Sequence, residues 1–303
     1  MSFTLANLTY RVARELGIVS EGTATGGSTT TIEDTNLRTE ADDYWNSGSI
    51  WILRDSSGAI VAPLGEYERV TDFANSGGVI TFAALTVTVA SGDKYAVAKK
   101  TYPLETLIRN VNEAVQDLGI IPQTDITTID TETNKTEYSL PVAANLDLRR
   151  VWQQGNLDDA NDNRWTLLYN WELQRTATGS KDLLVFPYQL PSGYDIKLEY
   201  GAPHPELHVY SDNLNEGVPI TMVVYSAVAR CLNWFRQKHN TNSRRLLDDI
   251  ERYEERAEMQ RQKWTRRLPP RTGKIMLVPK TTQVDTSDVP LTVSLTDDYV
   301  EWG

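Results

Sequence analysis

The stretch that most constrains the fold of this chain is residues 217–267, whose pattern predicts two consecutive helices. Pro219 suits the first turn of a helix, where the N–H that proline lacks would be unpaired anyway. The apolar residues that follow share one helical face through their three- and four-residue spacing: Ile220, Val223, Val224, Ala227, Val228 and Cys231. Further apolar side chains cover much of the other side, so this helix must be buried on nearly every side.

The second helix of this stretch is predicted to be one-sided and charged. Residues 239–242 interrupt the first helix, Ser243 can cap the next one, and residues 268–270 (Leu-Pro-Pro) end it. Its apolar stripe is Leu246, Leu247, Ile250, Tyr253, Ala257 and Trp264. We interpret the pair as an assembly element rather than a catalytic one. The residues predicted to pack between subunits are Ile220, Val224, Val228, Trp234, Tyr253 and Trp264.

Charge is unevenly distributed along the sequence. The chain carries a net charge of −11, which argues against a general nucleic-acid binder. Residues 230–274 hold 13 Lys/Arg and 6 Asp/Glu, a net charge of +7, so the remainder carries −18. This asymmetry fits a partner of opposite charge or subunits that meet basic side to acidic side, and it equally fits an ordinary solvated helix surface.

The single cysteine, Cys231, lies at an apolar helical position and cannot form an internal disulfide. The first 17 residues are amphipathic and lack the apolar centre of a signal peptide. No window approaches 18 consecutive apolar residues, so no membrane span is predicted.

The rest of the chain alternates between helical and strand periodicity. Residues 1–19 and 102–120 each predict an amphipathic helix, and their matching Leu-x-x-Leu-x-x-x-Val patterns suggest helices that pack together, although chance similarity explains the match equally well. Between them, residues 20–101 contain five short period-two segments, which indicate an inserted barrel or sandwich. Residues 121–216 predict a second β segment.

Residues 269–303 have no helical period and are predicted to form an extended C-terminal arm. Its apolar residues suit docking onto a partner, often by strand addition, or folding back onto the chain's own domain. The predicted docking residues are Leu291, Val293, Leu295, Tyr299, Val300 and Trp302. Together these segments predict an α+β protein in which residues 1–19, 102–120 and 217–268 form a helical-bundle core.

The sequence offers little support for catalysis. His204 and His208 have a metal-like spacing, but the neighbouring prolines exclude a regular helix. Residues 158–170 resemble a calcium loop only in part, because Arg164 and Asn170 replace the required Gly and Glu. No phosphate loop, dinucleotide motif or nucleophile elbow is present. We therefore predict a non-enzyme with no catalytic, cofactor-binding or metal-binding residues.

The 8 tryptophans leave an alternative open. Tryptophans on strands, such as Trp51, could stack on sugars in a carbohydrate-binding module, whereas core and interface packing is the commoner use of tryptophan. A hydrolase that uses paired carboxylates such as Asp42 and Asp43 is a further alternative, but 41 acidic residues make such pairs frequent by chance.

Several short strings occur in a characteristic order. Leu16-Gly17-Ile18 ends the first predicted helix, Leu118-Gly119-Ile120 ends the second, and Glu216-Gly217-Val218-Pro219 leads into the helix pair. This arrangement over residues 1–267 resembles the head-to-tail adaptor proteins of tailed bacteriophages, also called connector or neck proteins. The inserted segment 31–73 also looks like a β module of phage structural proteins.

The resemblance implies a helical-bundle protein of the virion that forms a homo-oligomeric ring, usually of twelve copies, beneath the portal protein. It implies further contact with a tail, stopper or nozzle protein, and passage of double-stranded DNA through the lumen without specific binding during genome ejection. Such a protein is assembled in the host cytoplasm, has no cofactor and does not contact a membrane. The alternatives are a tail or fibre-attachment protein, and a carbohydrate-binding β module on a helical oligomerisation domain.

Overall fold

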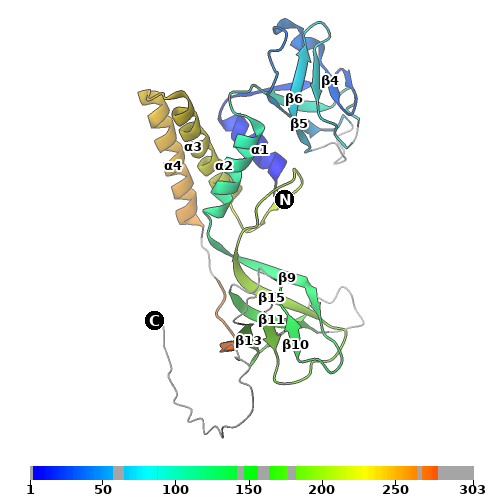
Figure 1. The fold of residues 1–303 in the computed structure, drawn as a ribbon, viewed down its shortest axis with the longest axis vertical. Helices are drawn as coiled ribbons and strands as arrows, with labels where there is room; N and C mark the ends of the chain where they lie inside the picture. The colour runs from blue at the N-terminus through cyan, green and yellow to red at the C-terminus, as the bar shows by residue number, and fades with distance from the viewer. Residues whose placement is uncertain are drawn as a thin grey trace, which may run out of the picture. The chain divides into compact units, whose positions relative to one another are not determined.

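The computed structural model describes residues 3–56, 65–86, 88–141, 147–155, 164–176, 182–264 and 268–278 (Figure 1). The chain forms two compact units, one comprising residues 1–123 with 201–268 and the other residues 124–200 with 269–303. Each unit is described separately below.

The first unit contains the four α-helices of the described residues: α1 (Leu5–Glu15), α2 (Leu104–Gln116), α3 (Ile220–His239) and α4 (Arg244–Lys263). It also contains one short 3-10 helix, η1 (Thr35–Thr39). Its strands are β1 (Phe3–Thr4), β2 (Val19–Thr23), β3 (Gly26–Gly27), β4 (Thr31–Glu33), β5 (Ser49–Arg54), β6 (Tyr67–Ala74), β7 (Val79–Phe82), β8 (Lys94–Ala98) and β16 (Asn213–Leu214).

The strands of the second unit begin with β9, which the chain enters from the first unit, and include β15, by which it returns. They are β9 (Ile120–Asp130), β10 (Glu137–Ser139), β11 (Leu148–Gln154), β12 (Trp165–Leu168), β13 (Glu172–Thr176), β14 (Leu183–Val185), β15 (Asp195–Pro203) and β17 (Lys274–Val278).

The predicted fold class is wrong. In the described part of the chain, 17 strands in four sheets outnumber four helices, so the protein is mainly β and a helical bundle is not its core. The physical reason is that many strands are short or polar and are stabilised by pairing with distant segments. For example, β1 pairs with β16, more than 200 residues away along the chain, and two-residue strands leave no periodic signal in the sequence.

The individual helices do form where their local signals predict them. The Thr4 hydroxyl caps α1 by accepting the Asn7 N–H at 3.3 Å, and Ser243 caps α4 in the same way. Asn240 ends α3 in the left-handed conformation at φ 46°. The helices α1, α2 and α3 contact one another, and α4 packs along α3 (Figure 1).

Seven strands form one sheet in the order β2-β8-β5-β6-β7-β4-β3. Alternate residues of β5 face two different cores. Ile50 and Ile52 pack in the core of this β module, whereas Trp51 packs with the helices and donates its indole N–H to the Thr9 hydroxyl at 3.2 Å. The β module is therefore joined to α1 through β5 within one unit.

A buried hydrogen bond stabilises this module. The Tyr95 hydroxyl donates to Asp34 Oδ2 at 2.8 Å, and both residues are almost fully buried. Burial, followed by the hydrogen bond with the Asp34 carboxylate, raises the pKa of Tyr95 far above its ordinary value. The neutral phenol is therefore the form that the folded unit requires.

Tyr95→Phe is expected to lower the free energy of unfolding by about 2 kcal/mol, because it leaves a buried carboxylate oxygen without its donor. Since the pKa of Tyr95 is raised on folding, the wild type keeps this contribution below about pH 10 and loses it as the pH rises further. Urea denaturation at pH 7 and pH 11 measures both effects. Tyr44→Phe is the control and should change stability by less than about 0.5 kcal/mol; equal losses for the two variants would contradict this role of Tyr95.

The second unit contains two four-stranded sheets, ordered β12-β11-β15-β9 and β10-β14-β13-β17. Along β15, Ile196, Leu198 and Tyr200 are buried and alternate with half-buried charged residues. The first part of the predicted arm belongs to this unit, since β17 pairs in parallel with β13. The predicted docking residues of the arm lie outside the described residues: Leu291, Val293, Leu295, Tyr299, Val300 and Trp302.

Candidate functional site

Half of the residues predicted to pack between subunits lie inside the protomer. Val224, Val228 and Tyr253 are 5%, 0% and 7% exposed and belong to the core formed by the helices. Their apolar character is satisfied by contacts within one copy of the chain. They therefore carry no argument for a subunit interface.

The other three predicted packing residues are only partly covered. Trp264 donates its indole N–H to the Gly217 carbonyl at 2.8 Å, and the ring of Trp234 lies 5.9 Å from that of Tyr102. Ile220 is half-buried at the start of α3. These side chains keep accessible surface that another molecule could cover.

Ile220 faces an open groove between α1 and α3 with a volume of about 480 Å³. Both helices contribute, α1 through its polar face and α3 through its first two turns. The groove is lined by Asn7, Tyr10, Arg11, Arg14, Glu15, Ile220, Thr221, Val224 and Tyr225. The α1–α3 groove therefore combines an apolar and aromatic wall with charged side chains.

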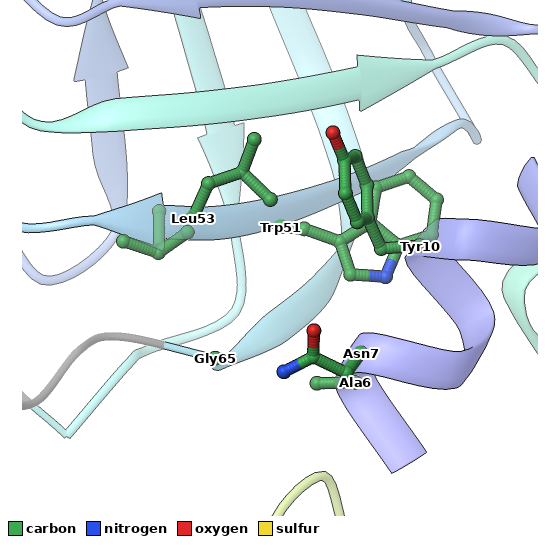
Figure 2. Close-up of a pocket in the computed structure, with 7 residues that line it drawn as sticks. Ala6, Asn7, Tyr10, Trp51, Leu53 and Gly65 are labelled. Carbon is green, nitrogen blue, oxygen red and sulfur yellow. The ribbon is translucent and has the colours of Figure 1, made fainter. Parts of the chain in front are cut away.

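A smaller hollow of about 230 Å³ lies between α1 and β5 (Figure 2). Asn7 and Tyr10 line this hollow as well as the groove, so the two share the exposed face of α1. The rings of Tyr10 and Trp51 are 6.4 Å apart and inclined by 57°. Figure 2 shows Ala6 and Asn7 projecting from α1 on one side of the hollow and Leu53 on the other.

The electrostatics of the α1–α3 groove are positive although the chain is acidic. Within the described residues, Arg11, Arg14 and Arg256 form no ion pair. Arg256 does not line the groove, but its guanidinium lies 5.9 Å from the centre of the ring of Tyr225, which does. The acid that lines the groove, Glu15, accepts a hydrogen bond from the Tyr253 hydroxyl at 3.2 Å.

Tyr10 lines both the groove and the smaller hollow and is uncharged at neutral pH. Burial, followed by its hydrogen bond to Glu21 Oε1 at 2.5 Å, raises the pKa of Tyr10 to about 12. A neutral phenol with an aromatic neighbour forms a surface for apolar or aromatic groups, and the arginines beside it attract carboxylates.

The described residues contain no cluster of three or more His, Cys, Asp or Glu side chains that could hold a metal ion. His204 is buried, with Nδ1 2.7 Å from the Pro205 carbonyl and Nε2 accepting the Asn215 N–H at 2.9 Å, whereas His208 is exposed. Both ring nitrogens of His204 therefore serve the local backbone.

Asp42, Asp43 and Trp51, which the sequence offers for catalysis or sugar binding, have structural roles. Asp42 accepts the Asn75 N–H at 3.0 Å and Asp43 accepts from the Asn46 amide at 2.6 Å, so each carboxylate stabilises a turn. Trp51 is 1% exposed and offers no ring face to a sugar. Residues 158–163 of the segment that partly resembles a calcium loop lie outside the described residues.

The groove arginines were missed by the sequence interpretation. Glu15 follows Arg11 by four residues, which suggests an ordinary surface ion pair on a helix. The structure instead connects Glu15 to Tyr253, a contact that spans 238 positions of sequence and leaves no local signal.

Comparison of the chain with known protein families finds no matching family model, and comparison with curated proteins finds no significant match. Among the described helices, none combines the length and apolar character that a membrane span requires.

Proposed function

We propose that this chain is a structural protein of a tailed-phage virion, a head-to-tail adaptor that assembles as a ring between portal and tail. The observation that carries the proposal is helix α4. It has 20 residues, about 30 Å of length, yet it buries only Ile250 and Tyr253 within the protomer. A helix that contributes so little to its own core is better explained by contacts with another molecule.

The exposed surface of α4 suits a neighbouring subunit. It carries six basic and six acidic residues, so its charges balance while both signs are presented. Leu247 and Met259 lie among these charges with 37% and 51% of their surface exposed. Apolar side chains within a mixed charged surface favour a specific contact of fixed register.

The open grooves also support a structural role over an enzymatic one. The site on α1 is formed by two open hollows that share Tyr10, and the larger one is also lined by Arg11 and Arg14, as expected for a binding surface for another chain. The order of the short sequence strings resembles that of phage adaptors. This resemblance is the basis for proposing an adaptor ring in particular, with portal and a tail protein as partners and DNA in the lumen.

The full chain is expected to form a closed ring of about twelve copies, visible by electron microscopy and native mass spectrometry. Leu247→Glu with Met259→Glu should raise the dissociation constant of the ring at least tenfold, because it replaces apolar contacts by like charges. The matched control is Ile126→Glu with Val209→Glu, two residues whose side chains are about half exposed elsewhere on the surface.

A monomer at all concentrations, with or without portal, would refute the ring. Binding of the purified ring to portal supports an adaptor, whereas binding to tail or fibre components alone would favour a fibre-attachment protein.

A further inference from the structure

We propose that the α1–α3 groove binds the acidic and aromatic C-terminal segment, residues 297–302, of a neighbouring copy of this chain. The segment reads Asp-Asp-Tyr-Val-Glu-Trp. The inference rests on the proposed assembly in that it needs a second copy, and it assigns to that assembly a specific contact between subunits.

Unpaired positive charge in the groove is the first argument. Arg11 and Arg14 are both exposed and lie one helical turn apart on α1, and neither has an acidic partner within the described part of the chain. Arg256 adds a third guanidinium beside Tyr225. Three arginines without carboxylate partners attract an acidic ligand, particularly through charge-assisted hydrogen bonds.

The charge of the segment is the matching observation. Residues 281–303 contain five acidic residues and no Lys, Arg or His, a net charge of −5 from side chains. Three of these acids, Asp297, Asp298 and Glu301, lie within the proposed ligand. The charge of the segment is thus complementary to the charge of the groove.

The groove and the segment also both contain apolar and aromatic side chains. Ile220 and Tyr225 are half-buried on the α3 side of the groove, and Tyr10 forms part of its α1 side. In the segment, Tyr299 and Val300 follow two acids, and Trp302 follows Glu301. Aromatic anchors in a groove with arginines at its rim are the usual composition of an energetically important contact.

These features favour the segment over nucleic acid. A phosphate backbone would meet the three arginines but would also meet Glu15 and an apolar wall, within a chain of net charge −11. A peptide that contains both acidic and apolar residues uses both parts of the groove.

Cross-linking tests the contact in the full chain. Light chains that carry a benzophenone amino acid in place of Tyr299 are assembled with a tenfold excess of ¹⁵N-labelled wild-type chains and irradiated. The expected products join light residue 299 to heavy peptides containing residues 5–15 or 220–225. Products that join residue 299 only to its own light chain, or only to other regions, would overturn the inference.

Charge exchange provides the quantitative test. Arg11→Glu with Arg14→Glu, and separately Asp297→Arg with Asp298→Arg, should each weaken assembly at least tenfold by sedimentation analysis. The combined variant should return to within about threefold of the wild type, since both charges of each pair are reversed. The control is Arg54→Glu with Lys100→Glu, an equal charge change on the β module that should have no such effect. Failure of the combined variant to recover, or an equal loss in the control, contradicts the proposed pairing.

The mass of the unirradiated sample separates the two proposals. A ring whose residue 299 does not cross-link to the groove removes the groove assignment alone. A sample that is monomeric throughout removes the assembly itself.

Discussion

Trp171→Ala is expected to lower the free energy of unfolding of the unit formed by residues 124–200 and 269–303 by about 3–5 kcal/mol. Trp171 is fully buried and donates its indole N–H to the Thr272 hydroxyl at 3.1 Å. A Cβ atom added to Gly273 would overlap the indole ring, so the backbone of the C-terminal segment lies directly against Trp171. Removing the Trp171 ring therefore leaves a cavity next to Gly273, directly before β17, and leaves the Thr272 hydroxyl without this donor.

Urea denaturation followed by circular dichroism gives the stability loss, and hydrogen exchange at residues 274–278 reports whether β17 remains paired with β13. Tyr169→Ala is the control. Its ring is 58% exposed in the same unit, and its loss should cost less than about 0.5 kcal/mol. If the two variants lose equal stability, Trp171 does not have the assigned role.

Gly273→Val tests the docking of β17 independently of the loss of the Trp171 ring. It leaves Trp171 intact but places a side chain where the structure has no room for one. Amides of β17 should lose protection while those of β11 and β15 keep it. Continued protection at residues 274–278 would show that β17 does not depend on this close approach.

The helices could be predicted because their signals are local. Pro103 before α2, Ser243 before α4 and a left-handed Asn240 after α3 all act within one helical turn. Their apolar stripes required no knowledge of the partner. Local signals of this kind predict a helix and its two ends, but they do not predict which part of the protein packs against its apolar face.

The sheets depend on contacts that the sequence does not display locally. Thr, Gln and Asp dominate the middle of β9, so its eleven residues show no apolar alternation. The parallel pairing of β17 with β13 joins segments about 100 residues apart. Strands of this kind form because a distant strand satisfies their backbone groups, and this explains why a helical-bundle core was wrongly predicted.

The same limit applies to the candidate site. The sequence pattern around an apolar helical residue such as Val228 is the same whether that residue is buried within the protomer or by a neighbouring subunit. Conversely, Arg11 and Arg14 read as an ordinary polar helix face, and only the fold places them beside Ile220 and Tyr225. The groove could therefore not be identified from spacing alone.

A pair of substitutions on α3 separates these two kinds of position. Val228→Asp should lower the free energy of unfolding of the unit formed by residues 1–123 and 201–268 by more than about 4 kcal/mol, because it places a carboxylate in a fully buried apolar core. Ile220→Asp puts the same group at the half-buried wall of the groove, so the protein should fold with a small loss of stability.

The two variants should also differ in assembly. Ile220→Asp places an acid opposite the acidic segment and should weaken assembly at least tenfold while thermal unfolding stays nearly unchanged. Val228→Asp should fail at folding, which circular dichroism detects before any question of assembly arises. A well-folded Val228→Asp monomer that cannot form rings would instead identify Val228 as an interface residue. It would also show that the helices exchange their packing partners between the protomer and the assembly, because a side chain enclosed within one copy cannot contact another without such a rearrangement.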